Sequence, residues 1–397
     1  MDNNEPGTAY RLSGGGLLSS IHTRIRGPNA SVTPLARFLV TMGLLWLPLA
    51  VVTAITGTFA GDKVAQPFIT DVVPQVRFLI ALPLLLFAGM AIDPAIDYTI
   101  RNLINSGVVP EKEQSQFQAA LMSLARRRDS IWPDIIILIS AFIFTLAYHP
   151  GYGQDALELA DTTWIHPDHS GTDGLSIAGW WYFLICAPLF QLILLRWIWR
   201  FLIWTGFLFQ LSRIRFTLHS THPDLAGGIG TLGLSQQAFV VLFIALGTVL
   251  SSTIAYDMMF GSGSVEGAKL DVIAFIVICL VALYAPLMLF ANQMYVARRR
   301  GLRQYGALGY RMSAAFWEQW IARAGKDVGT KLKEAVDPSA MADYGTIFDT
   351  VRNMRFVPVS PRNIATTAAA LTAPFLPLYL ISFSITDLID RIVNALV

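Results

Sequence analysis

The chain has 397 residues, of which 54% are hydrophobic and 14% are charged, and its formal net charge is +2. Soluble domains carry about 25% charged residues, so this composition excludes an ordinary soluble protein. The apolar residues also fall into uncharged blocks whose length, about 18 residues or more, is typical of membrane spans. We therefore predict an all-α, polytopic integral membrane helix bundle.

The N-terminal residues 1–36 are polar and Gly-rich, without the apolar stretch of a signal peptide. We expect them to form a cytoplasmic segment. Cys186 and Cys279 both lie within apolar blocks, so neither a disulfide framework nor a cysteine-based metal site is expected. No sequence motif indicates a particular cofactor.

Seven apolar blocks follow, each near the roughly twenty residues that cross a bilayer. They cover residues 37–59, 75–97, 132–149, 176–200, 237–258, 271–296 and 364–386. Basic residues are retained in the cytoplasm, and segments 1–37, 101–130, 196–215 and 298–362 hold 25 of the 29 Lys and Arg residues. The apolar blocks predict about seven spans, and the distribution of basic residues places the N-terminus inside and the C-terminus outside. The expected location is the plasma membrane, which in a prokaryote is the inner membrane.

The three spans that run inward each contain a proline, at Pro83, Pro188 and Pro286. A proline removes a backbone hydrogen bond and can break a membrane helix near its middle. The similar sequence around each proline suggests three related helical hairpins, spanning 37–297 in total, plus a seventh span. The alternative is that proline is ordinary in membrane helices.

Polar residues inside a membrane are costly and therefore informative. Asp93 and Asp97 lie on one face of the second span, where they would attract a cation, relay protons, or pair with nearby arginines to hold helices together. Arg196 and Arg200 interrupt the fourth apolar block, which continues to Leu211 and, if helical throughout, is about 54 Å long. We expect these arginines to mark the cytoplasmic interface, with residues 201–211 continuing as an interfacial or subunit-contacting segment, and we assign all four charges to an ion or solute pathway.

Residues 218–235 form a Gly-rich turn just before the fifth span. Its glycines let backbone amides converge on an anion, and its histidines and aspartate could bind a metal. The alternative is a capped turn with tight helix packing. The candidate residues for an anion or a metal are His219, His222, Asp224, Gly227, Gly228 and Gly230.

Two further segments lie outside the apolar blocks. Residues 150–175 form an acidic loop without Lys or Arg, which we interpret as a solvated outer loop, with a metal or pH-sensing role as the alternative. Residues 298–363 contain apolar positions at helical spacing from Met312 onward, which predicts a cytoplasmic amphipathic helix that lies on lipid or contacts another subunit. Residues 364–397 form the seventh span and the outer C-terminus.

These features favour a channel or transporter for a small ion or polar solute, because a conduit needs broken spans and buried polar groups. We expect the chain to contact the lipid bilayer, to form a homo-oligomer and to bind no nucleic acid. One alternative is a membrane scaffold or sensor subunit without transport. Another is a membrane-embedded enzyme acting on a lipid or phosphorylated carrier at the cytoplasmic face, with His222 as acid-base and Asp224 as its partner.

Overall fold

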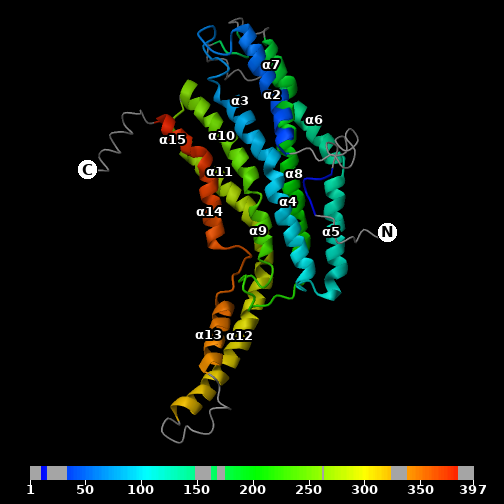
Figure 1. Cartoon of the computed structure of the whole chain (residues 1–397), viewed down its shortest axis with the longest axis vertical. Coiled ribbons are helices and arrows are strands. Elements are labelled where there is room, and N and C mark those ends of the chain that lie inside the picture. Colours follow the sequence, from blue (N-terminus) through cyan, green and yellow to red (C-terminus); the bar gives the residue numbers. More distant parts are fainter. Residues whose placement is uncertain are drawn as a thin grey trace, which may run out of the picture.

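The structure, a computed structural model, describes residues 10–15, 34–147, 162–167, 175–261, 263–322 and 338–382. Apart from an isolated bridge between Gln66 and Thr163, these residues contain no β-structure. The helices form an elongated bundle, and α12 and α13 project together from one end of it (Figure 1). We call this the basic end. The opposite end, which holds residues 57–71 and 162–167, is the loop end.

The helices before the Gly-rich turn come from the first half of the chain. They are α2 (Pro34–Thr56), α3 (Val72–Val76), η1 (Arg77–Ala81), α4 (Leu82–Asn105), η2 (Glu111–Glu113), α5 (Gln114–Asp129), α6 (Trp132–Ala147), α7 (Ile177–Trp181), η4 (Tyr182–Cys186) and α8 (Ala187–Ser212). The helices after the turn are α9 (Thr231–Gln237), α10 (Val240–Phe260), α11 (Val265–Tyr284), η5 (Ala285–Phe290), α12 (Ala291–Phe316), η6 (Trp317–Ile321), α13 (Pro338–Arg352), α14 (Pro361–Thr372), η7 (Ala373–Phe375) and α15 (Leu376–Ser382).

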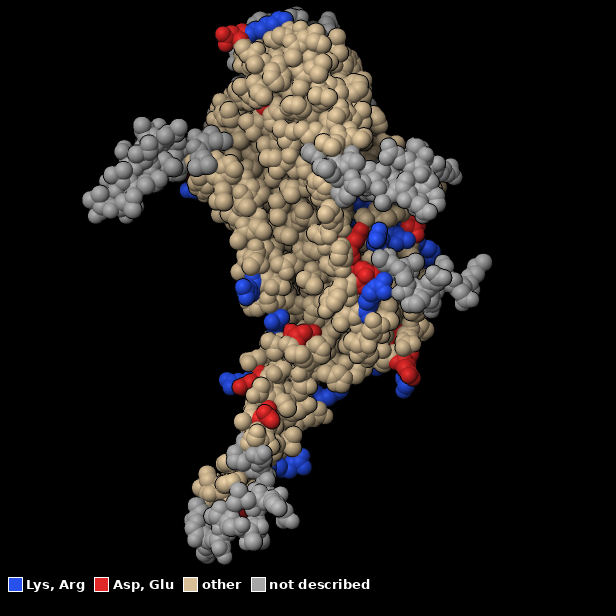
Figure 2. All heavy atoms as spheres, viewed as in Figure 1, with Lys and Arg blue, Asp and Glu red and all other residues tan. Residues whose placement is uncertain are grey.

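Five of the described helices are long and apolar enough to cross a membrane. Their outward faces are apolar: Ile55 is 80% exposed on α2, and Leu270 and Ile278 are 76% and 66% exposed on α11. Figure 2 shows a broad uncharged surface over this part of the bundle, with charged side chains gathered mainly toward the basic end. Exposed apolar surface of this extent is unusual in water and suits a bilayer. The fold is therefore that of a multi-pass α-helical membrane protein.

The predicted count of seven spans is not established by the structure. The five long helices correspond to the first, second, fourth, fifth and sixth predicted blocks, within Leu39–Thr56, Val72–Asn105, Ile177–Ser212, Thr231–Phe260 and Glu266–Ile321. The third block is the shorter apolar helix α6, and the seventh is divided into α14, η7 and α15, which run beside α10 and α11 (Figure 1).

The three helices that contain Pro83, Pro188 and Pro286 are interrupted beside these prolines. Before Pro83 the helix makes a π turn, η1, in which the Leu82 N–H donates to the Arg77 carbonyl. Before Pro188 it makes a second π turn, η4, in which the Ala187 N–H donates to the Tyr182 carbonyl. The third interruption, at Pro286, is a 3₁₀ segment instead. A proline cannot donate to the preceding turn, so the hydrogen-bond ladder shifts next to it.

The first two interrupted helices match element for element at an offset of 105 residues. Each has an N-cap side chain that accepts a backbone hydrogen bond (Asp71 and Ser176), then five α-helical residues, five π-helical residues and a second α-helix with proline in its first turn. The third helix shares only the proline break, because α11 runs for 20 residues before η5. The structure thus relates one helix from each of two of the three proposed hairpins.

The same two helices are much longer than a membrane core. Residues 72–105 and 177–212 form continuous helical runs of about 51 and 54 Å, against about 30 Å of hydrocarbon. Sequence reasoning placed residues 201–211 at an interface or a subunit contact. In the structure one side of this stretch belongs to the core, while Leu202 and Phe209 are 52% and 47% exposed. Trp204, Phe207 and Leu211 are fully buried, and α5 packs along this part of α8. The apolar core of the bundle therefore continues past the charged residues at the basic end.

The projecting pair of helices places the predicted amphipathic segment away from the bundle (Figure 1). Helix α12 packs on α13, where the Tyr344 hydroxyl donates to the Tyr305 carbonyl at 2.5 Å. A side chain at Gly309 would collide with Tyr344, so the glycine permits this close packing. Residues 323–337 of the amphipathic segment and most of the acidic loop 150–175 lie outside the described residues.

Opposite ends of the bundle should be accessible from opposite sides of the membrane. We predict that Lys63→Cys, at the loop end, reacts with a membrane-impermeant maleimide on intact cells, and that Gln304→Cys, on α12, reacts only after permeabilisation. The native cysteines are 0% and 2% exposed, so the unmodified chain gives the background signal. The reverse labelling pattern would place the basic end outside, against the positive-inside rule.

Candidate functional site

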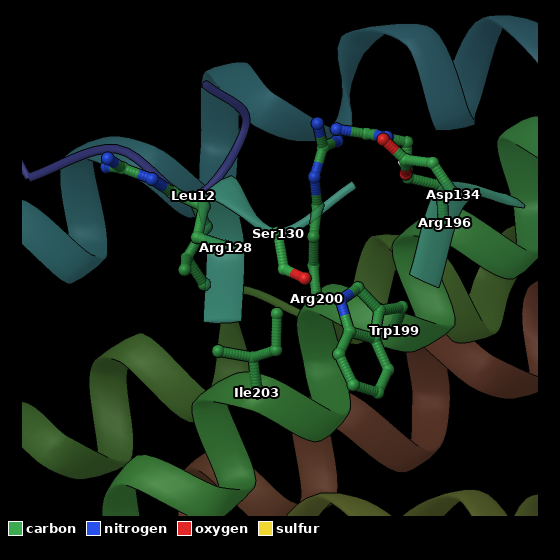
Figure 3. Close-up of a pocket in the computed structure, with 8 residues that line it drawn as sticks. All are labelled: Leu12, Arg128, Ser130, Asp134, Arg196, Trp199, Arg200 and Ile203. Atoms are coloured by element: carbon green, nitrogen blue, oxygen red, sulfur yellow. Dashed lines mark hydrogen bonds and ion pairs between the residues drawn. The ribbon is translucent and has the colours of Figure 1, made fainter. Parts of the chain in front are cut away.

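Charged side chains from four helices meet at the basic end of the bundle. Asp93 and Asp97 project from α4 and Arg196 and Arg200 from α8, as shown for the α8 pair in Figure 3. We define the charge cluster as Asp93, Asp97, Arg128, Asp134, Arg196 and Arg200. The structure therefore brings together the four residues that the sequence assigned to a pathway, and it adds Arg128 from α5 and Asp134 from α6.

Part of the charge cluster is paired internally. Arg196 forms an ion pair with Asp134, and their side chains are 10% and 11% exposed. Asp97 pairs with Arg101 one turn away at 2.8 Å. The guanidinium of Arg200 lies over the Trp197 ring, 4.5 Å from its centroid. Of these contacts, the Arg196–Asp134 ion pair joins two helices, α8 and the start of α6, and the other two lie within α4 and within α8.

The rest of the charge cluster binds residues 10–15 of the same chain. Both the Leu12 and Ser13 N–H groups donate to Asp93 Oδ1, at 2.9 and 3.0 Å, and the Ser13 hydroxyl donates to the second carboxylate oxygen. The Tyr10 N–H donates to Asp97 at 2.8 Å. Asp93 is 9% exposed, and a carboxylate so buried needs donors of this kind.

The carbonyl groups of the same segment face arginines. Arg128 donates to the Arg11 carbonyl at 3.0 Å and Arg200 to the Ser13 carbonyl at 2.7 Å. Arg196 donates to the Gly15 carbonyl. The segment is thus held from one side by carboxylates and from the other by guanidinium groups.

A small cavity of about 10 Å³ opens within the charge cluster (Figure 3). Its walls are Leu12, Arg128, Ser130, Asp134, Arg196, Trp199, Arg200 and Ile203. A space of about this volume holds one water molecule. In this structure residues 10–15 occupy the place that a larger ligand would need.

Two residues of the matched π turns also meet inside the bundle. Arg77 Nη1 donates to the Tyr182 hydroxyl at 2.5 Å, and these are the first residues of η1 and η4. The Arg77 guanidinium lies 5.5 Å from the centroid of the Phe190 ring, and its Nε is buried without a hydrogen-bond partner. Among the described residues, no carboxylate lies within ion-pair distance of Arg77. Sequence reasoning missed this contact.

The loop end above this pair is filled by an aromatic side chain. Trp164 is 1% exposed and its indole N–H donates to Asp71 at 2.9 Å. Its ring makes edge contacts with Phe68 and Tyr182 at centroid distances of 5.0 and 5.7 Å. Residues 162–167 therefore close the bundle at this end.

The Gly-rich turn forms a separate structure around Asp224. The carboxylate accepts the N–H groups of Ala226 at 2.8 Å, Gly228 at 3.1 Å and Gly230 at 2.9 Å. Gly227 and Gly228 adopt left-handed φ values of +70° and +100°, which turn successive amides toward one point. The amides suited to an external anion are therefore already bonded to the aspartate of the turn.

The two histidines of the turn lie at the surface. His219 and His222 are exposed, and His222 Nδ1 lies 2.8 Å from Asp224 Oδ1. No group of three or more His, Cys, Asp or Glu side chains in the described ranges is arranged to hold a metal ion.

Several glycines of this region also permit close packing. A Cβ on Gly301 of α12 would lie 2.2 Å from the Ser220 hydroxyl oxygen, and one on Gly233 would lie 2.0 Å from the Pro358 carbonyl oxygen. The Arg355 N–H donates to the Leu225 carbonyl at 2.8 Å. The turn therefore joins the bundle to α12 and to the chain that follows α13.

The Asp224 carboxylate should stabilise the fold in a pH-dependent way. Burial raises its pKa, but the N–H groups of Ala226, Gly230 and Gly228, together with His222, outweigh this and lower the pKa below its usual value. A lowered pKa means that the contribution is present above the unfolded-state pKa of about 3.9 and is lost as the pH falls from there through the lower folded-state pKa.

We predict that Asp224→Asn lowers the free energy of unfolding by about 2 kcal/mol at pH 7, since a charged acceptor for buried amides is lost. Thermal unfolding in detergent measures this, and the difference from the native chain should shrink as the pH falls below 4. The matched control is Asp343→Asn, which removes an exposed carboxylate on α13. A difference that is equal at pH 7 and pH 3 would contradict the assignment.

Comparisons with protein-family profiles, with curated proteins and with solved structures found no match for this chain. The structure itself presents a multi-pass helical membrane protein with a charge cluster that binds residues 10–15. It also presents a contact between two π turns, made by Arg77 and Tyr182.

Proposed function

We propose that the protein is a channel or transporter for a small ion or polar solute, and that the structure represents a closed state. The observation that carries the proposal is the contact between two matched, interrupted helices, made by Arg77 and Tyr182. Transport proteins place their binding sites where broken helices from corresponding segments meet near the middle of the membrane.

The electrostatic environment of Arg77 supports a transport function. A cation within an apolar bundle is costly, and ionisable residues in membrane helices commonly face a solute or ion pathway. Arg77 donates to a neutral hydroxyl and lies against an aromatic ring. The Asp71 carboxylate attracts it from beyond ion-pair distance, so the charge of Arg77 is only partly compensated. An anionic or dipolar solute would compensate it better than a cation.

Short segments cover the matched helices at two places, the loop end and the charge cluster. At the loop end Trp164 fills the space beside Tyr182, and at the basic end residues 10–15 bind the charge cluster. A conduit that alternates between open and closed states needs such removable covers, whereas a purely structural bundle does not. We propose that the basic end is cytoplasmic, that the membrane is the plasma membrane, and that the functional unit is a homo-oligomer.

We predict that Arg77→Gln reduces solute flux at least tenfold and that Tyr182→Phe reduces it less, because Arg77 keeps its charge. The measurement is uptake of labelled chloride, potassium and alanyl-alanine into proteoliposomes, with size-exclusion profiles confirming that each variant folds. Lys63→Gln, in an exposed loop-end position, is the control and should leave flux unchanged. Absence of flux for every probe with native protein, or equal flux in all variants, would overturn the proposal.

The projecting hairpin favours a second candidate function, that of a scaffold or sensor subunit. Helices α12 and α13 extend away from the bundle (Figure 1), and Tyr310 and Trp317 are 78% and 58% exposed on that projection. Exposed aromatic residues are typical of protein interfaces. Recovery of a stable, stoichiometric partner together with absence of flux would favour this function over transport. The enzyme hypothesis has no comparable support, since the amides it needs are bonded to Asp224.

A further inference from the structure

The contacts of residues 10–15 are made largely by main-chain groups. The carbonyl groups of Arg11, Ser13 and Gly15 all accept from arginines. The N–H groups of Tyr10, Leu12 and Ser13 donate in the other direction, to the carboxylates of α4. Residues 12–14 form a bend, so the consecutive N–H groups of Leu12 and Ser13 converge on one oxygen of Asp93, and the Ser13 hydroxyl donates to the other.

The two walls of the charge cluster carry opposite charges. Asp93 and Asp97 form a wall of acceptors on α4, and Arg128, Arg196 and Arg200 form a wall of donors on α5 and α8. A simple cation or anion would satisfy only one wall. A peptide segment satisfies both, because each residue other than proline carries a donor N–H and an acceptor C=O.

Two glycines also leave room for the main chain of residues 10–15 beside α4 and α5. Gly89 of α4 faces Ser13, and a Cβ there would lie 3.2 Å from the Ser13 Cβ. Gly15 has a φ of +84°, and a Cβ on it would lie 2.3 Å from an Asp129 carboxylate oxygen. Leu12, 2% exposed, is the apolar side chain that anchors the segment beside the small cavity.

The occupant is held mainly by polar contacts that another ligand can reproduce. If residues 10–15 leave, Asp93 and Arg200 lose these main-chain partners, and unpaired buried charges are strongly unfavourable. Release of the segment therefore calls for a replacement of the same chemistry. A tethered segment also competes with a free ligand at a high effective concentration.

We propose that the charge cluster is a binding site for peptide main chain, that residues 10–15 are its tethered occupant, and that a free peptide can take their place. The identification of that peptide with the transported solute rests on the proposed function, whereas the binding site itself does not. The site belongs to the basic end and is distinct from the Arg77–Tyr182 contact.

The test uses the full-length chain in lipid nanodiscs and a fluorescent peptide with the sequence of residues 8–16. In the variant Leu12→Asp, a carboxylate beside Asp93 should expel the tethered segment. Fluorescence anisotropy should then show at least tenfold tighter peptide binding than to the native chain. A peptide N-methylated at the leucine amide, which cannot donate to Asp93, should bind at least tenfold more weakly than the unmodified peptide.

Within the Leu12→Asp background, Asp93→Asn and Arg200→Gln should each weaken peptide binding at least tenfold, and Lys63→Gln should have no effect. If Leu12→Asp fails to fold by size-exclusion chromatography, Ser13→Pro replaces it, since it removes the N–H and the hydroxyl that bond to Asp93. Equal binding of the N-methylated peptide, or equal binding to native and variant chains, would overturn the proposal. Peptide binding without flux would overturn transport and leave the binding site standing.

Discussion

The buried charges of α4 and α8 set the main constraint on the basic end of this protein. Asp93 and Arg196 are 9% and 8% exposed, and charges so buried are tolerated only with partners. Residues 10–15 bond to both charges, and Asp134 pairs with Arg196. The positions of the N-terminal segment and of the start of α6 follow from this requirement.

The same two helices connect the charge cluster to the loop end. Each runs from its N-cap at the loop end through a π turn and then past the charge cluster. Because Arg77 and Tyr182 join the π turns to each other, a change in the spacing of α4 and α8 at the charge cluster would alter this contact near the loop end. Binding or release of residues 10–15 can therefore be coupled to the loop end through rigid helices, which is the kind of two-state element that gating requires.

The Gly-rich turn has a structural role that explains its unusual composition. Asp224 gathers the amides of the turn, and the glycines make room for Ser220 and Pro358 against neighbouring segments. This arrangement sets the direction in which α12 leaves the bundle. Residues that read as an anion or metal motif in the sequence thus contribute to the junction between the membrane bundle and its projecting hairpin.

The sequence alone determined the helical membrane class, because uncharged blocks of span length have no other stable environment. It also indicated the proline interruptions and the four charged residues of α4 and α8, since charge and proline are conspicuous in apolar helices. Only the tertiary structure decided what those charges bind, because residues 10–15 and Asp134 are distant from them in the chain and carry no local signal of the contact. The same holds for Arg77 and Tyr182: their pairing depends on how two helices pack, which no spacing within either helix encodes.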